Sequence, residues 1–225
     1  MNLSLRGSVA PRLLLQHHIL LTPLSLQMIY NEGWGQITSY HPEFALTEVI
    51  KTLDPTRLVD AVSGWHDHGA GDFRDNHHYV GAQCGTPWAD DNTGPFDPSR
   101  IGFQGEFGGL GHNVSEAHLW KVENAINGIN QTYEMYTSLD DWNFRSHFLL
   151  SELLLQVQLW SCAGAVWTET TDVEGELNGM LTYDRRIVRP DVKTWQRDIQ
   201  VSVWRGETCC LRVSSDGKPV GTCAD

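Results

Sequence analysis

The sequence predicts an α/β fold that corresponds to part of a (β/α)8 barrel of the TIM type, and three observations predict it. Short β-favouring runs alternate with segments of helical periodicity, which implies parallel strand pairing. Two of these runs end in a glutamate close to glycine, and functional groups gather at the carboxyl ends of parallel strands. The periodic region covers residues 28–172, which at about 30 residues per strand–helix unit holds about five strands. We therefore expect the second half of a barrel, with residues 28–200 as the folded unit.

The first expected strand covers residues 28–31, and a helix follows it. Four apolar side chains of this helix recur at the i, i+3, i+4, i+7 spacing of one buried face, namely Leu46, Val49, Ile50 and Leu53. Asp54 precedes Pro55. Because the residue before a proline disfavours helical backbone, we expect the helix to end there.

The remaining elements follow in alternation. Further strands are expected at residues 57–63, 76–80, 101–106 and 164–170. Two long helices are expected at residues 115–136 and 140–161. The packing positions expected for the first of these helices are Leu119, Trp120, Ile126, Ile129 and Tyr133. In the second, the expected buried stripe consists of Phe144, Phe148, Leu155 and Leu159, joined by Leu149 and Leu153.

The two ends of the chain differ from this periodic region. Residues 1–27 contain no acidic residue, carry Arg6 and Arg12, and resemble a leader peptide whose apolar run Pro23 interrupts. We interpret them as an extension outside the fold. Residues 201–225 contain cysteines without any periodicity, so we expect an irregular tail with at most one hairpin.

Composition excludes several classes of protein. A formal net charge of −12 argues against a nucleic-acid partner, whose phosphates it would repel. No stretch reaches the apolar length of a membrane span. The five cysteines include no Cys-x-x-Cys pair, and we expect Cys162, in an apolar helical run, to be a buried thiol. Glycosylation sequons at Asn113 and Asn130 and the leader-like start favour an extracellular over a cytoplasmic location.

Glu32 and Glu106 are the candidate catalytic residues. Each lies where a β-favouring run ends and a glycine-containing turn begins, a position that the scaffold holds while the side chain faces a cleft. Two carboxyl groups that face one sugar are the minimum for cleavage of a glycosidic bond. One carboxyl group must be protonated to donate to the leaving oxygen, and the other must be ionised to attack the anomeric carbon.

Five motifs in this order resemble glycoside hydrolase family 2, which includes β-galactosidases, β-glucuronidases and β-mannosidases. They are residues 31–36 (Asn-Glu-Gly-Trp-Gly-Gln), 53–57 (Leu-Asp-Pro-Thr-Arg), 63–65 (Ser-Gly-Trp), 105–109 (Gly-Glu-Phe-Gly-Gly) and 171–179 (Thr-Asp-Val-Glu-Gly-Glu-Leu-Asn-Gly). The resemblance covers about residues 29–193 and implies the fourth to eighth strands of the family's catalytic barrel. It implies a hydrolase of carbohydrate metabolism that cleaves O-glycosidic bonds with retention and needs no organic cofactor.

The resemblance also implies roles for single residues. Glu32, on the fourth strand, would be the general acid/base, and Glu106, on the seventh, the nucleophile. Asn31 would hold the 2-hydroxyl of the sugar. Tyr79 is similar to the tyrosine that hydrogen-bonds the nucleophile. Retention requires the two carboxyl groups to lie about 5–5.5 Å apart.

Two more residues complete the predicted substrate site. His77 precedes Tyr79 on the sixth strand, and Trp167, on the last strand, would form part of the floor under the sugar. The implied partner is a β-glycoside, either small or oligosaccharide. The family's first three barrel strands and accessory domains are not recognisable in this sequence. The alternatives are a truncated gene model, a fragment, or an isoform that needs a partner chain to complete the barrel.

Two other functions remain open. The first is a metal-dependent hydrolase that uses the histidines and acids between His66 and His78, because imidazole and carboxylate at His-x-His spacing are good zinc ligands. The second is a non-catalytic remnant that binds carbohydrate or nothing. The 171–179 loop also leaves room for a divalent cation, because its side chains alternate as calcium ligands do, although the resemblance favours a loop at the sugar rim.

Overall fold

A computed structural model of the chain describes residues 41–64, 66–84, 97–120 and 133–201 with their side chains. It describes the backbone alone at residues 27–30, 202–208, 212–213 and 219–220.

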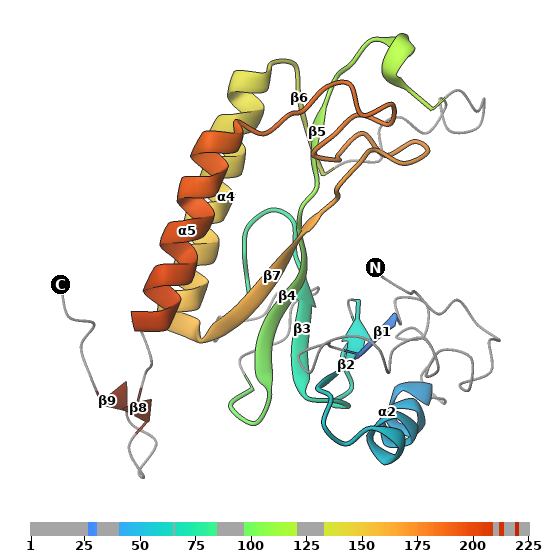
Figure 1. Ribbon diagram of the computed structural model, residues 1–225, viewed down its shortest axis with the longest axis vertical. Helices are drawn as coiled ribbons and strands as arrows, with labels where there is room; N and C mark the ends of the chain where they lie inside the picture. The colour runs from blue at the N-terminus through green and yellow to red at the C-terminus, as the bar shows by residue number, and fades with distance from the viewer. Residues whose placement is uncertain are drawn as a thin grey trace.

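Parallel strands form the centre of the described structure (Figure 1). β1 (Gln27–Tyr30) pairs with β2 (Val59–Ser63), and β2 contacts β3 (Phe73–His77). β3 pairs in turn with β4 (Ile101–Gly108), which pairs on its other edge with β7 (Cys162–Thr168). All of these pairings are parallel, so the parallel pairing predicted from the strand–helix alternation is confirmed.

Three smaller elements extend this array. β5 (Leu110–His112) continues almost directly from β4 and pairs in parallel with β6 (Glu134–Tyr136). A short 3-10 helix covers Glu116–His118. In the C-terminal part, β8 (Arg212–Val213) and β9 (Pro219–Val220) form the hairpin expected in the tail.

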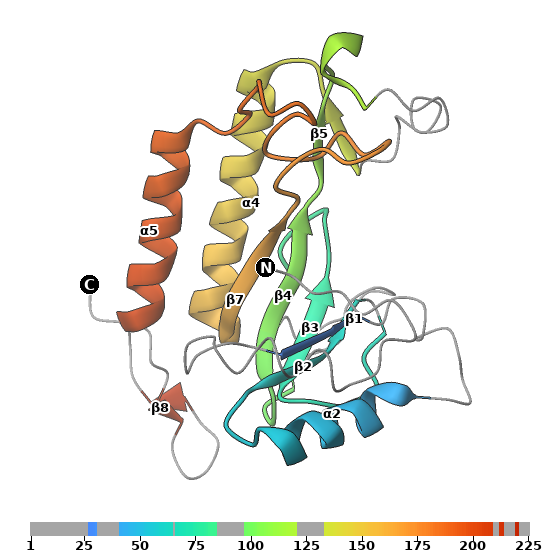
Figure 2. The same cartoon turned by 45° about the vertical axis from the view of Figure 1, so that its right-hand side comes forward.

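The helices lie at two places around the strands (Figure 2). α2 (Pro42–Leu53) packs on β2, and α4 (Leu139–Trp160) lies side by side with α5 (Val192–Thr208) next to β7. α4 begins where the Ser138 hydroxyl accepts a hydrogen bond from the backbone N–H of Asp141, a standard N-cap. None of the helices in the described part of the chain combines the length and apolar character needed to cross a bilayer.

Two hydrophobic clusters fix these layers. The larger lies between the β4–β7 pair and the helices α4 and α5, and its buried members are Phe107, Leu110, Trp142, Leu149, Leu150 and Trp195. The smaller lies between β2 and α2, where Leu46 and Ile50 pack on Val59, Ala61 and Val62. Phe107 is the β4 residue of the larger cluster, and successive side chains of a strand point to opposite faces. The β4 side chains next to Phe107 therefore face away from the helices and are available for a site.

Several expectations about the elements are wrong. Residues 134–136, placed in a helix over 115–136, form β6, because their backbone pairs with β5. The strand expected at residues 76–80 lies three residues earlier, at Phe73–His77. α5 begins within the expected folded unit and continues into the segment that was expected to be irregular.

The buried face of α4 is also not the expected one. Phe144, Phe148, Leu155 and Leu159 are 48–75% exposed, so their predicted burial is wrong. Leu149 and Leu153, which were expected to join them, do pack in the core, together with Trp142 and Leu150. Both faces of this helix are apolar, so periodicity alone does not identify the inner one.

Cys162 is not a thiol in a helix. It is the first residue of β7 and forms a disulfide with Cys84, across a sequence separation of 78 residues. The Cα atoms lie 5.5 Å apart, a normal separation for a disulfide. The bond joins the segment that follows β3 to the start of β7, on the two sides of β4.

Candidate active site

Glu106 lies near the carboxyl end of β4, on the face opposite the helices. Its neighbour Phe107 points into the larger hydrophobic cluster, and successive side chains of a strand point to opposite faces. The Glu106 side chain is 30% exposed, so it is accessible to a ligand while the backbone around it is held on both edges.

Two glycines are needed where β4 ends beside Glu106. Gly108 and Gly109 have φ values of 102° and 64°, in the region that favours glycine. A Cβ at Gly108 would lie 2.7 Å from the Trp167 ring, and one at Gly109 would lie 2.5 Å from Tyr133. The chain therefore passes between aromatic rings at a distance that only glycine allows.

Tyr79 and His77 contact the Glu106 carboxylate. The Tyr79 hydroxyl donates a 2.6 Å hydrogen bond to Glu106 Oε2, and Nδ1 of His77 lies 3.5 Å from the same oxygen. The Tyr79 ring stacks on Tyr133 with a centroid separation of 3.7 Å. Burial, and then the negative charge of Glu106, raise the pKa of Tyr79, so its hydroxyl keeps the proton that it donates. The structure thus brings together three of the predicted site residues.

A buried polar chain continues behind His77. Nε2 of His77 lies 3.8 Å from Oδ2 of Asp75, and Asp75 interacts in turn with Asp60 on β2. Burial and the charge of the neighbouring carboxylate raise the pKa of Asp75, and burial also raises that of Asp60. Two buried carboxyl groups in contact favour keeping a proton between them, so Asp60 and Asp75 form a protonated pair behind the candidate site.

Sequence reasoning missed Asp60, and it considered Asp75 only as a metal ligand of the histidine-rich segment. Asp60 interrupts the apolar run of β2, and an acid at a strand position that should be buried was the available signal. Asp75 also fixes the backbone, because Oδ1 accepts a hydrogen bond from the N–H of Gly105, where any Cβ would overlap the carboxylate. The residue before Glu106 is therefore a glycine for a steric reason.

Trp167 packs against the larger hydrophobic cluster. Its ring makes edge contacts with Phe107, Trp142 and Trp195, within the cluster that joins β7 to the helices. Its role as a floor under the sugar stays a prediction.

Asn31 and Glu32 follow β1, which ends at Tyr30. Both lie outside the described residues, so the separation between the two candidate catalytic carboxyl groups also stays a prediction.

The loop after β7 holds a further acid near the site. Burial raises the pKa of Glu169 to about 8, and the nearby charges of Glu176, Asp172 and Glu106 act in the same direction. Asp172 is buried and bound to Arg189, so within this loop it is committed to an ion pair. Asp172, the first acid of the calcium-like spacing in the sequence, is therefore not available as a calcium ligand.

Glu169→Gln is expected to flatten the pH dependence of stability between pH 4.5 and pH 8. In the wild type, the unfolded carboxyl group ionises above about pH 4.5 whereas the folded one stays protonated to about pH 8, so stability falls as pH rises through this window. Because solvent screens this partly exposed group, we expect the free energy of unfolding of Glu169→Gln at pH 8 to exceed that of the wild type by only about 1–2 kcal/mol. Urea unfolding from pH 4.5 to pH 8.5 measures it. Glu174→Gln, an exposed acid of the same loop, is the control, and parallel pH profiles for wild type and Glu169→Gln would contradict the assignment.

The histidine-rich segment does not form one metal site. Asp67 is bound by Arg74 and Arg100, and Asp72 by Lys51, while Asp75 faces Gly105. Its His68 instead meets two residues of another segment, His41 and Glu43.

Comparison with known proteins adds no identification at this point: no protein-family model matches the chain, and no curated protein matches it.

Proposed function

We propose that this chain is a retaining β-glycoside hydrolase, of the β-galactosidase-like kind that the resemblance to glycoside hydrolase family 2 implies. The observation that carries the proposal is the Glu106 carboxylate, partly exposed at the end of a central parallel strand and bound by Tyr79 at 2.6 Å. A carboxylate held by a phenol in this way is directed, as an attacking group must be.

The chemistry assigned to the site has two steps. Glu106 attacks the anomeric carbon while the leaving oxygen takes a proton from Glu32, and a glycosyl ester forms on Glu106. Water then attacks the same carbon, gives its proton to Glu32 and releases Glu106 as a carboxylate. Asn31 would bind a hydroxyl group of the sugar, and no organic cofactor takes part. His77, predicted to bind the substrate, has a fully buried side chain, so it would contact Glu106 and not the sugar.

We also propose that β1, β2, β3, β4 and β7 are five consecutive strands of a (β/α)8 barrel. The support for this is that each strand pairs with or contacts the next in chain order and that every pairing is parallel. Eight strands close such a barrel, so we propose that a partner chain supplies others. Light scattering of the active species measures its mass, and an active monomer would contradict this part.

The experiment that tests the function is a panel of 4-nitrophenyl β-galactoside, β-glucuronide and β-mannoside with the purified chain. Hydrolysis of one of them with retained configuration, read by NMR of the first-formed sugar, supports the proposal. A chain that unfolds cooperatively but hydrolyses none would support the non-catalytic alternative. The metal-dependent alternative gains no support from the geometry, because most of the acids that it needs are paired with other groups.

The disulfide supports an extracellular location as part of this proposal. Disulfides persist in oxidising compartments, and Cys84–Cys162 closes a loop long enough to contribute about 2–4 kcal/mol to the free energy of unfolding. We expect dithiothreitol to lower the stability of the wild type by about this amount but to leave a Cys84→Ser, Cys162→Ser double variant unchanged. Equal sensitivity of the two proteins would contradict the assignment.

A further inference from the structure

Glu43 is an unusual residue for its place in the fold. It lies in the first turn of α2, in register with Leu46 and Ile50, which pack onto β2. This is the inward face of the helix, where an apolar side chain is expected, yet Glu43 is 0% exposed. Burying a carboxylate is costly unless its oxygens have partners, so the surroundings of this group require an explanation.

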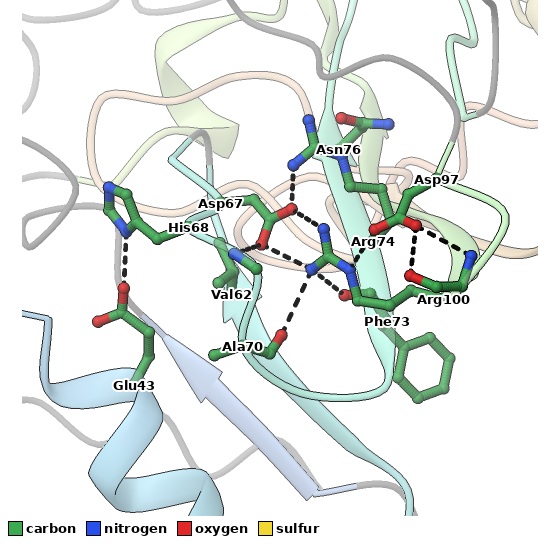
Figure 3. Close-up of polar contacts among 12 residues, drawn as sticks. Glu43, Val62, Asp67, His68, Ala70, Phe73, Arg74, Asn76, Asp97 and Arg100 are labelled. Carbon is green, nitrogen blue, oxygen red and sulfur yellow. Dashed lines mark hydrogen bonds and ion pairs between the residues drawn. The ribbon is translucent and has the colours of Figure 1, made fainter.

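Two histidines meet this carboxylate. Nδ1 of His68 lies 2.6 Å from Glu43 Oε1, and Nδ1 of His41 lies 3.5 Å from the same oxygen (Figure 3 shows the His68 contact). The rings of the two histidines approach to a centroid separation of 4.0 Å. One ligand atom from each of the three residues lies within 4.8 Å of the others. The set therefore converges from the start of α2 and from the loop after β2.

The partners present do not satisfy this cluster. Glu43 Oε2 and His41 Nδ1 are buried and make no hydrogen bond in the described structure. A simple pair between Glu43 and a protonated His68 would account for Oε1 alone. It would leave the second carboxylate oxygen and the second imidazole without a function.

The loop that carries His68 is held firmly from the other side. Asp67 is bound by Arg74 and Arg100, so its side chain is turned away from Glu43 whereas that of His68 is turned toward it (Figure 3). Gly71, with a φ of 75°, lies so close to Val59 and Ala61 that a Cβ would clash. A loop fixed in this way presents His68 in a defined position, as a metal ligand requires.

We propose that His41, Glu43 and His68 bind a divalent transition metal of the Zn²⁺ class. Two imidazoles and one carboxylate are a ligand set that Zn²⁺ accepts, with a fourth position left for water or a ligand. Tetrahedral coordination at about 2.0–2.1 Å places ligand atoms about 3.3 Å apart. The 3.5 Å contact of His41 already matches this spacing, and the 2.6 Å contact of His68 needs to open by less than 1 Å. The metal would join α2 to the loop after β2.

The test is metal binding by the purified full chain after treatment with a chelator. We expect one Zn²⁺ per chain by mass spectrometry of the desalted protein, and a Co²⁺ derivative with the visible absorption of a four- or five-coordinate site. His41→Gln and His68→Gln should each weaken Zn²⁺ binding by at least about 100-fold, because each removes a ligand.

His147→Gln is the matched control. His147 also contacts a carboxylate, at 2.7 Å from Asp198, but among the described residues no third ligand lies beside it. Its substitution should leave Zn²⁺ affinity unchanged. Failure of the wild type to take up Zn²⁺, or equal binding by all three histidine variants, would overturn the proposal. The Co²⁺ spectrum needs the wild type alone, so a variant that fails to fold does not block the test.

Discussion

Glu106→Gln is expected to lower the hydrolysis of the best chromogenic β-glycoside by about 10³- to 10⁶-fold, the range for removal of an enzymatic nucleophile. The glutamine side chain fits the same space and can still accept the Tyr79 hydrogen bond that Glu106 accepts at 2.6 Å. It cannot form the glycosyl ester, because a neutral amide oxygen is a poor nucleophile. The loss should therefore appear in kcat, with the unfolding midpoint of the variant close to that of the wild type.

Two controls separate this interpretation from a general effect of removing a charge. Glu48→Gln changes an exposed glutamate of α2 and should leave the rate unchanged. Glu106→Gly with added azide should recover turnover and release a glycosyl azide of inverted configuration, because azide attacks from the vacated side of the sugar. Unchanged turnover in Glu106→Gln would reject the nucleophile assignment directly.

Tyr79→Phe should have a smaller effect on the same assay. Tyr79 holds the carboxylate but does not react, and a hydrogen bond to a charged group contributes about 1.5–3 kcal/mol, or roughly 10- to 150-fold in rate. A loss as large as that of Glu106→Gln would mean that Tyr79 takes part in the reaction itself.

The sequence was sufficient to predict the features that depend on local order. The parallel strands, the long helix and the strand-end position of Glu106 follow from short periodic runs and from the glycines beside them. Tyr79 was reached through the resemblance alone, because its contact with Glu106 joins residues 27 positions apart. Such a contact exists only once β3 and β4 are paired.

The features that sequence reasoning missed depend on which surfaces meet. α4 carries apolar residues on both faces. Its inner face is the one that carries Trp142 and Leu150, because these side chains pack in one cluster with Phe107 and Trp195. The pair of Cys84 and Cys162 is separated by 78 residues. The partners of Glu43 come from two segments that only the folded chain brings together. None of these has a signal in a single stretch of sequence.

Arg189→Gln is expected to lower the free energy of unfolding by about 3–5 kcal/mol, because it leaves a buried carboxylate without its counter-charge. Arg189 and Asp172 are 1% and 2% exposed. The guanidinium donates to both carboxylate oxygens, at 2.6 and 2.7 Å. It also donates to the backbone carbonyls of Gly179 and Leu181, so it holds the loop that carries Glu169. Urea unfolding at pH 7 measures the change.

Arg186→Gln is the matched control for this experiment. Arg186 also pairs with an aspartate, Asp184, at 3.7 Å, but its side chain is 79% exposed. Exposed pairs contribute little, so the unfolding midpoint of this variant should not change measurably. Adding Asp172→Asn to Arg189→Gln should recover part of the lost stability, because it removes the uncompensated charge while the asparagine oxygen still accepts from the Gly179 N–H. If the double variant is less stable than Arg189→Gln alone, the cost comes from the lost hydrogen bonds of Arg189 and not from the buried charge.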